Sequence, residues 1–352
     1  MGRIKLLQRQ IKNPILIKKK ENLFYLTGRF FMHGYLLIKP INADKKRSNT
    51  DVIFFGDGLE KVEGLKSDRL KNIPLYLGKA HELELEDEFT FVEYNYIRAK
   101  CAALRAKLKI SHVRSPVDYQ RAIKDPGEIA LVKKSMQIVE AVFKRARKEI
   151  KKPRMTEARL AQFIQNMGLK MGANDLSFPA IVASGANAAI PHHVPSNKKL
   201  KAGESIILDF GFKYKNYCSD FTRTVFLKKA HPKLETAYNQ VEKAYNQSIN
   251  FAKVGVTAGK VYQKAVDVLA EKKLDKYFIH SLGHGTGLEI HELPNLSPNS
   301  KDILQNGMVF SIEPGVYIPK LGGIRIEDLV YLDAGKVKKF INQPTNLSNC
   351  IL

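Results

Sequence analysis

The chain has 352 residues, more than one hydrophobic core usually organises, so two domains are expected. Apolar residues make up 44% of it and charged residues 26%, a balance that excludes a mainly disordered protein. The three cysteines lack short metal-ligand spacing, which argues against a disulfide framework and a thiolate zinc site. No segment approaches the roughly 20 apolar residues of a membrane span, so a cytoplasmic protein without a membrane partner is expected.

The formal net charge of +23 is the unusual bulk property. Twelve Lys and Arg residues lie in the first fifty positions, where the only acids are Glu21 and Asp44. Such a surface attracts polyanions, but a solvated, generally lysine-rich surface is the favoured explanation of the charge. With no RNA-recognition aromatic motif or Cys/His finger present, nucleic acid is expected only as a partner of the basic surface.

Residues 1–123 are predicted to form a small α/β domain. Short apolar runs separated by polar turns indicate strands, and the segment from Tyr96 to Leu108 has a composition compatible with a helix. The predicted strands are Asn22 to Thr27, Tyr35 to Ile38, Val52 to Phe55, Leu75 to Leu77 and Phe89 to Val92.

Residues 124–352 are predicted to form a larger α+β domain. Asp125-Pro126-Gly127-Glu128 supplies an N-cap, a proline at the first helical position and an acid at the third, so a long helix is expected to begin there. Further helices are predicted over Thr156 to Met167, Leu234 to Phe251 and Thr257 to Lys272, covering one side of a largely antiparallel sheet.

Two aspartates interrupt neighbouring apolar strands. Asp209 lies in the strand from Ser205 to Phe212, and Asp220 in the strand from Tyr217 to Leu227. A four-residue loop from Lys213 to Asn216 would make the two aspartates direct cross-strand partners on one face. Buried carboxylates at that spacing repel each other unless they share cations. The alternative is that one aspartate is a surface charge and Arg223 neutralises the other.

A second acid pair follows the same logic. Glu313 and Glu327 each follow an apolar run, and Lys320-Leu321-Gly322-Gly323 supplies a turn that would centre the hairpin on Lys320. Pro314 forbids regular ladder bonding beside Glu313, so an edge or a bulge is expected there.

His284 in Gly283-His284-Gly285-Thr286-Gly287 is the fifth candidate, because its flanking glycines allow close backbone approach and leave the imidazole room to reach a metal. Taken alone, a core histidine explains this motif better. Four carboxylates and one imidazole form an oxygen-rich set suited to two divalent cations such as Mn²⁺ or Co²⁺, with Zn²⁺ and Fe²⁺ also compatible. Two such ions can activate water and polarise an amide carbonyl.

Five ordered motifs resemble the pita-bread metallopeptidases. They are Ile-Leu-Asp209-Phe-Gly, Ser-Asp220-Phe-Thr-Arg-Thr, Gly-His284-Gly-Thr-Gly, Ile-Glu313-Pro-Gly and Ile-Arg-Ile-Glu327-Asp. The segment from Glu21 to Gly28 looks like the strand-and-turn opening of a creatinase-like N-terminal domain. This extra domain favours the aminopeptidase P and prolidase branch over the shorter methionine aminopeptidases, and the resemblance implies a homodimer.

The resemblance implies a role for each site residue. Asp209, Asp220, His284, Glu313 and Glu327 would hold two metal ions, and Glu313 would also shuttle a proton. A metal-bridging hydroxide would attack the Xaa-Pro carbonyl of a short proline-containing peptide, with His193 and His291 orienting the substrate and stabilising the oxyanion. His280 would line the proline-side pocket and Arg325 would contact the substrate.

Each supporting residue has a simpler explanation. His193 would then be a solvated loop residue, His280 a hydrogen-bonded core residue, and Arg325 a salt-bridge partner that supports the neighbouring acids.

The resemblance is compatible with two activities that differ in the length of the substrate, Xaa-Pro aminopeptidase and prolidase. Many prolidases carry an arginine after the His-Glu pair that suits the terminal carboxylate of a dipeptide, whereas this sequence reads His291-Glu292-Leu-Pro-Asn295. An Xaa-Pro aminopeptidase is therefore predicted first, with prolidase as the alternative.

Two other functions remain open on the sequence. A basic pita-bread module that binds RNA or protein would not need the metal ligands, and creatinase-like chemistry does not use the complete set.

Overall fold

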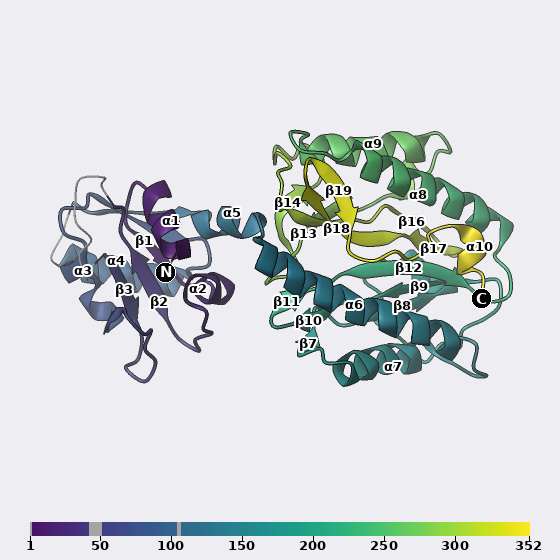
Figure 1. The fold of residues 1–352 in the computed structure, drawn as a ribbon, viewed down its shortest axis with the longest axis horizontal. Helices are drawn as coiled ribbons and strands as arrows, with labels where there is room; N and C mark the ends of the chain where they lie inside the picture. Colours follow the sequence, from purple (N-terminus) through teal and green to yellow (C-terminus); the bar gives the residue numbers. More distant parts are fainter. Residues whose placement is uncertain (1, 42–50, 104–106) are drawn as a thin grey trace. The chain divides into compact units, whose positions relative to one another are not determined.

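The computed structural model describes residues 2–41, 51–103 and 107–352. The chain divides into two compact units, Met1–Arg121 and Ala122–Leu352, which can be followed in Figure 1. The division falls two residues before the predicted first residue of the second domain. None of the helices in the described ranges is long and apolar enough to cross a membrane.

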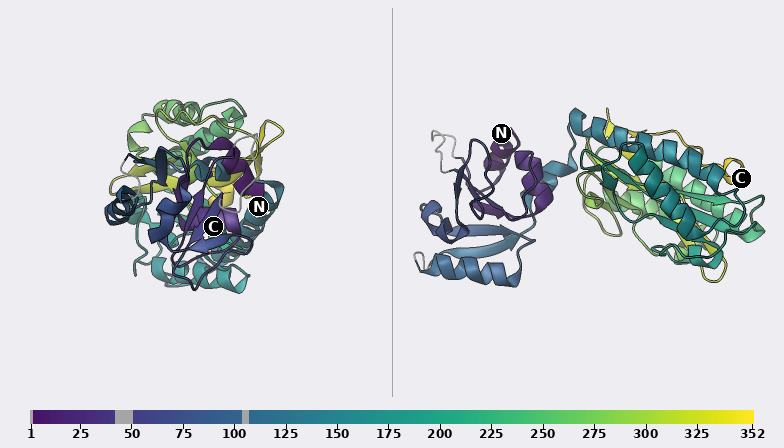
Figure 2. Two further views of the ribbon diagram at one scale, coloured as in Figure 1. Left: turned by 90° about the vertical axis from the view of Figure 1, so that its left-hand side faces the viewer. Right: turned by 90° about the horizontal axis from the view of Figure 1, so that it is seen from below.

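Within the described residues of the first unit, six strands form one mixed sheet (Figure 2). Its order is β4 (Lys66–Asp68), β3 (Val52–Phe55), β2 (Tyr35–Ile38), β1 (Ile15–Ile17), β5 (Glu82–Glu86) and β6 (Lys109–Val113). The helices of this unit are α1 (Gly2–Gln10), α2 (Lys20–Thr27), α3 (Ile73–Tyr76), α4 (Phe91–Ala102) and α5 (Pro116–Ala122). Strand side chains such as Leu16, Leu37 and Ile53 are fully buried in its core.

The predicted strands Tyr35 to Ile38 and Val52 to Phe55 are confirmed as β2 and β3, and the three other predicted strands are wrong. Asn22 to Thr27 belongs to helix α2, which ends at Gly28 with a left-handed φ of 78°. The segment from Glu21 to Gly28, expected to be a strand and a turn, is therefore a helix and its C-cap. Leu75 to Leu77 overlaps α3, and Phe89 to Val92 leads into α4.

Two of these errors have an identifiable cause, one local and one not. Thr90 and Glu93 form a reciprocal capping box that begins α4 directly after Phe89, and this signal outweighs the β-propensity of the apolar run. At α2 the cause is not local, because the Glu86 carboxylate accepts hydrogen bonds from the backbone N–H groups of Lys18 and Lys19. These two hydrogen bonds join the residues before α2 to strand β5.

The second unit, described without gaps, contains a large antiparallel sheet. Its order is β14 (Glu292–Leu296), β13 (Gly283–Gly285), β15 (Val309–Ile312), β18 (Glu327–Asp333), β12 (Phe221–Phe226), β9 (Ser205–Asp209) and β8 (Ile181–Ser184), with β19 (Lys336–Lys339) pairing β18. A smaller sheet joins β11 (Tyr217–Cys218), β10 (Phe212–Tyr214) and β7 (Asp175–Leu176), and β16 (Gly315–Ile318) pairs with β17 (Gly322–Arg325).

The long helices of this unit agree with the predicted ones. They are α6 (Pro126–Glu149), α7 (Glu157–Lys170), α8 (Pro232–Phe251) and α9 (Ala258–Ala270), followed by the short α10 (Leu347–Cys350). Asp125 and Glu128 form the capping box of α6, whose Val132, Met136, Val139 and Phe143 are buried. In Figure 1 the strands lie between the α8–α9 pair and the α6–α7 pair.

The hairpin that carries the two aspartates differs from the prediction by one residue. Lys215 and Asn216 both have left-handed φ values, 47° and 73°, and form a two-residue turn closed by the Tyr214–Tyr217 pair. This turn matches the right-handed twist of the strands better than a four-residue loop does. In the resulting register Asp209 lies opposite Thr222 and not opposite Asp220.

The hairpin that carries the two glutamates is centred on Lys320, as predicted. Gly315 pairs with Arg325 in the β16–β17 ladder, and Ile312 pairs with Asp328 in the β15–β18 ladder, so both ladders share that centre. Strand β15 ends at Ile312 and β16 begins at Gly315, so the ladder is interrupted at Glu313 and Pro314.

Candidate metal centre

A cavity of about 660 Å³ lies in the second unit and is lined by every site residue that the sequence predicted. Its lining includes Asp209, Asp220, His284, Glu313, Glu327, His193, His280, His291 and Arg325. Asp209 and Asp220 therefore face the same cavity although they are not cross-strand partners.

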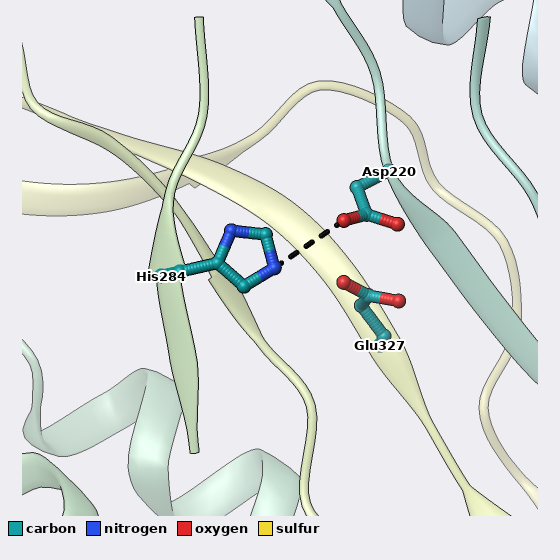
Figure 3. Close-up of side chains that lie close together, drawn as sticks. All are labelled: Asp220, His284 and Glu327. Carbon is teal, nitrogen blue, oxygen red and sulfur yellow. Dashed lines mark ion pairs between the residues drawn. The ribbon is translucent and has the colours of Figure 1, made fainter. Parts of the chain in front are cut away.

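Three of these residues form the tightest group. Ligand atoms of Asp220, His284 and Glu327 all lie within 4.8 Å of one another. Figure 3 shows the imidazole of His284 projecting from its strand towards the carboxylates of Asp220 and Glu327. The distance from His284 Nε2 to Asp220 Oδ2 is 3.5 Å.

Glu313 and Asp209 flank this group. Glu313 Oε1 lies 3.3 Å from His284 Nε2 and accepts a 3.1 Å hydrogen bond from the Ser311 hydroxyl. Asp209 Oδ2 lies 2.5 Å from an Arg325 nitrogen. The structure thus brings the five predicted ligands to one cavity from five positions far apart in the sequence.

The local backbone explains how His284 reaches the acids. A Cβ atom on Gly283 would lie 2.0 Å from the Ser311 carbonyl oxygen, and one on Gly285 would lie 1.9 Å from the Leu293 carbonyl oxygen. Only glycine permits this approach on both sides of the histidine. Nδ1 of His284 lies 3.1 Å from the Gly285 carbonyl oxygen, which only accepts hydrogen bonds. A neutral His284 therefore carries its proton on Nδ1 and directs the lone pair of Nε2 at the acids.

The carboxylates have ligand capacity that the protein itself does not use. Asp209 Oδ1 and Glu327 Oε1 are buried without a hydrogen-bond partner in the described part of the chain. A buried carboxylate oxygen without a partner is costly, and a divalent cation would satisfy it. The donor set therefore fits hard divalent cations.

The pKa shifts show the same excess of negative charge. Burial, with Asp209 as the next cause, raises the pKa of Asp220 well above its usual value, and burial with Asp220 nearby does the same to the pKa of Glu327. Burial also opposes ionisation of Glu313 and His284. Their mutual hydrogen bond outweighs it, lowering the pKa of Glu313 to about 2 and raising that of His284 to about 9.

Two arginines lie close to these acids and have separate partners. Arg325 donates to Asp209, to the Tyr317 hydroxyl at 2.6 Å and to the Thr222 hydroxyl at 3.2 Å. Arg223 is fully buried and bonds Asp328 at 2.7 Å. The alternative in which Arg223 neutralises Asp209 or Asp220 is therefore wrong.

His280 and His291 both face the cavity from the β13 side. His280 lies 2.9 Å from the Tyr317 hydroxyl. The ring of His291 packs edge-on against His284 with 4.3 Å between centroids. Burial is the main cause that lowers the pKa of each of these two histidines, so neutral rings face the cavity at neutral pH.

The neighbouring residues His192 and His193 have different partners. His193 also lines the cavity, but its Nε2 lies 2.9 Å from the Glu157 carboxylate, so the solvated-loop explanation is wrong. His192 is exposed, lines the cavity and acts electrostatically on both His280 and His291. The Pro-His-His-Val-Pro motif does not distinguish the two rings, because only the position of Glu157 decides which one is anchored.

Three supporting residues escaped the sequence analysis. Tyr317 connects His280 with Arg325, Thr222 donates a 2.7 Å hydrogen bond to Glu327, and Glu157 holds His193. Thr222 lies inside one of the five motifs, but no local signal marks the roles of these residues, because the contacts to His280, Glu327 and His193 join segments distant in the sequence.

Comparison with known proteins places this geometry in a family. Residues 130–334 match the pattern of metallopeptidase family M24. A Mycoplasma pneumoniae protein provisionally named as an Xaa-Pro aminopeptidase is 37% identical over 338 residues, covering 93% of this chain and 91% of its own length. An Xaa-Pro dipeptidase of Pyrococcus horikoshii is 32% identical and covers 93% of this chain and 92% of its own length.

The fold agrees with that placement. The crystal structure of the prolidase from Pyrococcus horikoshii superimposes with a TM-score of 0.86 at 28% identity, covering 98% of each chain. The predicted α+β pita-bread architecture with a smaller N-terminal domain is thus confirmed, and membership in a metallopeptidase family implies divalent metal ions. On its sequence, its fold and the residues gathered in its cavity, this chain belongs to metallopeptidase family M24.

Proposed function

We propose that this protein is a two-metal Xaa-Pro aminopeptidase that cleaves the bond between an N-terminal residue and proline in short peptides. The observation that carries the proposal is the convergence of four carboxylates and one imidazole on one cavity, with buried carboxylate oxygens that a cation would satisfy. The names of the relatives support the Xaa-Pro substrate class.

Asp209, Asp220, His284, Glu313 and Glu327 would hold the metal ions, with Mn²⁺ or Co²⁺ proposed from the oxygen-rich donor set. When bound, two such ions polarise the scissile carbonyl and supply an activated water. Arg325 positions Asp209 through their ion pair, and Thr222 orients Glu327.

The chain's own residues supply proton transfer and orientation. Glu313 is ionised, so it is able to accept a proton and later return it to the leaving amine. The neutral rings of His291 and His280 and the exposed ring of His192 face the cavity, where they would orient the peptide and stabilise developing negative charge. His193 is proposed to hold the cavity wall in place and not to contact the substrate, because its Nε2 is bonded to Glu157.

Substrates longer than a dipeptide are proposed because the cavity has no free cation for a C-terminal carboxylate. Arg325 is the only lysine or arginine among the described residues that line it, and Asp209 neutralises Arg325. Asn295, in the segment that follows His291-Glu292, lines the cavity, and its side chain is neutral. Prolidase activity is kept as the alternative because two of the compared proteins are named a dipeptidase and a prolidase.

A cytoplasmic homodimer is proposed as well. The cysteine usage supports the compartment, and the family resemblance alone supports the dimer.

The decisive experiment follows hydrolysis of Xaa-Pro and Xaa-Pro-Yaa peptides, with matched Xaa-Ala peptides, by metal-free protein supplied separately with Mn²⁺, Co²⁺ or Zn²⁺. We expect metal-dependent cleavage after the first residue of Xaa-Pro-Yaa. Asp220→Ala should lower kcat/KM by more than about 100-fold, because supporting residues alone cost about 10–100-fold.

Asp175→Asn is the matched control, because Asp175 is an exposed acid outside the cavity lining. It should leave activity unchanged. Equal cleavage of Xaa-Pro and Xaa-Ala bonds would contradict the substrate class, and preference for the dipeptide would favour prolidase. A folded protein without any cleavage would contradict the peptidase assignment.

A further inference from the structure

One stretch of the cavity lining is a continuous segment of five residues, Pro191 to Pro195, here called the wall segment. Packing holds it only weakly. Val194 is 80% exposed and the preceding Ile190 is 54% exposed, so little apolar area is buried here. The position of the wall segment must therefore depend mainly on hydrogen bonds.

Hydrogen bonds from His193 in the wall segment and from residues on either side of it converge on Glu157, the first residue of α7. Its side chain is completely buried and does not line the cavity. Oε1 accepts from the backbone N–H and the hydroxyl of Ser184, each at 2.7 Å, and from the Asn187 amide at 3.1 Å. Oε2 accepts from His193 Nε2 at 2.9 Å, and from the backbone N–H at 3.1 Å and the hydroxyl at 2.7 Å of Ser196.

The two oxygens therefore hold opposite ends of the same stretch of chain. Oε1 binds residues that precede the wall segment, and Oε2 binds His193 within it and Ser196 directly after it. Asn187 also reaches Oε2 at 3.1 Å and links the two groups of donors. An ionised carboxylate accepts on both oxygens and donates from neither, so it suits this set of donors. Burial opposes its ionisation, but the donated hydrogen bonds lower the pKa of Glu157.

We propose that Glu157 is a positioning residue for catalysis, which fixes the wall segment so that His192 and its neighbours meet the peptide in a productive geometry. The inference rests on the peptidase function proposed above. Displacement of substrate-contacting groups by about 1 Å can cost about 100-fold in rate, so the carboxylate is expected to control substrate binding without touching the substrate or the metal ions.

The test compares Glu157→Gln with wild type in the full-length protein. The glutamine carbonyl can replace Oε1, but its NH₂ group cannot accept from the Ser196 N–H, so the downstream half of the anchor is lost. We expect faster hydrogen exchange at the Ser196 amide, a roughly tenfold higher KM with a smaller change in kcat, and unchanged Mn²⁺ affinity. Glu157→Ala should also accelerate exchange at Ser184.

Two further variants separate positioning from general destabilisation. Ser196→Ala removes one donor to Oε2 and should raise KM in the same direction by less. Glu128→Gln is the matched control, because Glu128 is a buried acid that accepts a 2.6 Å hydrogen bond from Tyr217 and lies outside the cavity lining. It should lower stability and leave KM unchanged.

Three results would overturn the inference: an unchanged KM in Glu157→Gln despite faster exchange at Ser196, unchanged exchange in Glu157→Ala, or an equal rise of KM in Glu128→Gln. If the wild type cleaves no peptide, the proposed function fails. The exchange at Ser184 and Ser196 would then still decide whether Glu157 anchors the wall segment.

Discussion

At the scale of single residues, the site combines acids that strongly oppose ionisation with few cations to compensate them. Asp220 and Glu327 have raised pKa values because burial and neighbouring acids disfavour their charge. The nearest arginine, Arg325, is bonded to Asp209. Additional positive charge would favour the ionised form of these acids at neutral pH, and divalent ions supply it.

Asn295 is the residue at which substrate length can be tested. It pairs with His284 in the β13–β14 ladder, so both side chains lie on the cavity face. Asn295→Arg would add a cation for a dipeptide carboxylate. Because a hydrogen bond to a charged group contributes about 1.5–3 kcal/mol, the ratio of kcat/KM for Xaa-Pro over Xaa-Pro-Yaa should rise roughly tenfold.

Steady-state kinetics on the two peptides measures this ratio. Asn295→Gln is the control and should leave it unchanged, because glutamine adds length without charge. An unchanged ratio in Asn295→Arg would show that residue 295 does not select substrate length.

At the scale of elements, side chains at the ends of helices connect neighbouring elements. In the first unit Glu93, a member of the capping box of α4, also bonds Lys18 at 2.8 Å and the Tyr35 hydroxyl at 2.9 Å. One carboxylate thus joins the start of α4 to the ends of β1 and β2. Burial opposes the ionisation of Glu93, but these hydrogen bonds lower its pKa to about 2.

The pH dependence of stability at Glu93 follows from that shift. The pKa of Glu93 is lower in the folded chain than the ordinary 4.5, so its contribution is complete above about pH 4.5 and is lost as the pH falls towards 2. Glu93→Gln should therefore lower the free energy of unfolding by roughly 1 kcal/mol at pH 7, and the difference from wild type should shrink between pH 4.5 and 2.

Urea unfolding followed by circular dichroism at several pH values measures this difference. Glu88→Gln, at an exposed acid in the turn between β5 and α4, is the control and should have little effect at any pH. A Glu93→Gln deficit that stays constant down to pH 2 would contradict the role of the ionised carboxylate.

At the scale of the whole molecule, the two compact units differ in what they contribute. All five proposed metal ligands lie in the second unit, and the described residues of the first unit supply none of the cavity lining. Metal binding should therefore stabilise the second unit selectively. At a concentration one hundred times Kd, a ligand adds about 2.7 kcal/mol.

Hydrogen exchange of metal-free protein with and without Mn²⁺ tests this expectation. Protection should rise in β9, β12, β13, β15 and β18, which carry or adjoin the ligands, and should stay unchanged in β1 to β6. In Asp220→Ala the added metal should produce little protection. A uniform rise over both units would mean that the ion binds elsewhere or couples the units.

Much of the fold and of the candidate site could be predicted from local sequence patterns. The capping box at Asp125, the hairpin centred on Lys320 and the five motif residues are each determined by neighbours within a few positions, so short-range chemistry identifies them. The same reasoning failed at α2, because Glu86 of a distant strand binds the two residues that directly precede this helix. It also failed at the aspartate hairpin, because Lys215 and Asn216 adopt left-handed backbone that the residue types alone do not require.

By itself, the sequence determined the fold class, the family and the identity of the candidate ligands, because these depend on residue types at local spacings. Tertiary structure alone decided that Arg223 binds Asp328 while Arg325 binds Asp209, and that Glu157 anchors His193 of the wall segment and not His192. The physical reason is that a buried charge selects its partner by distance and desolvation. Both are set by segments that meet only in the folded chain.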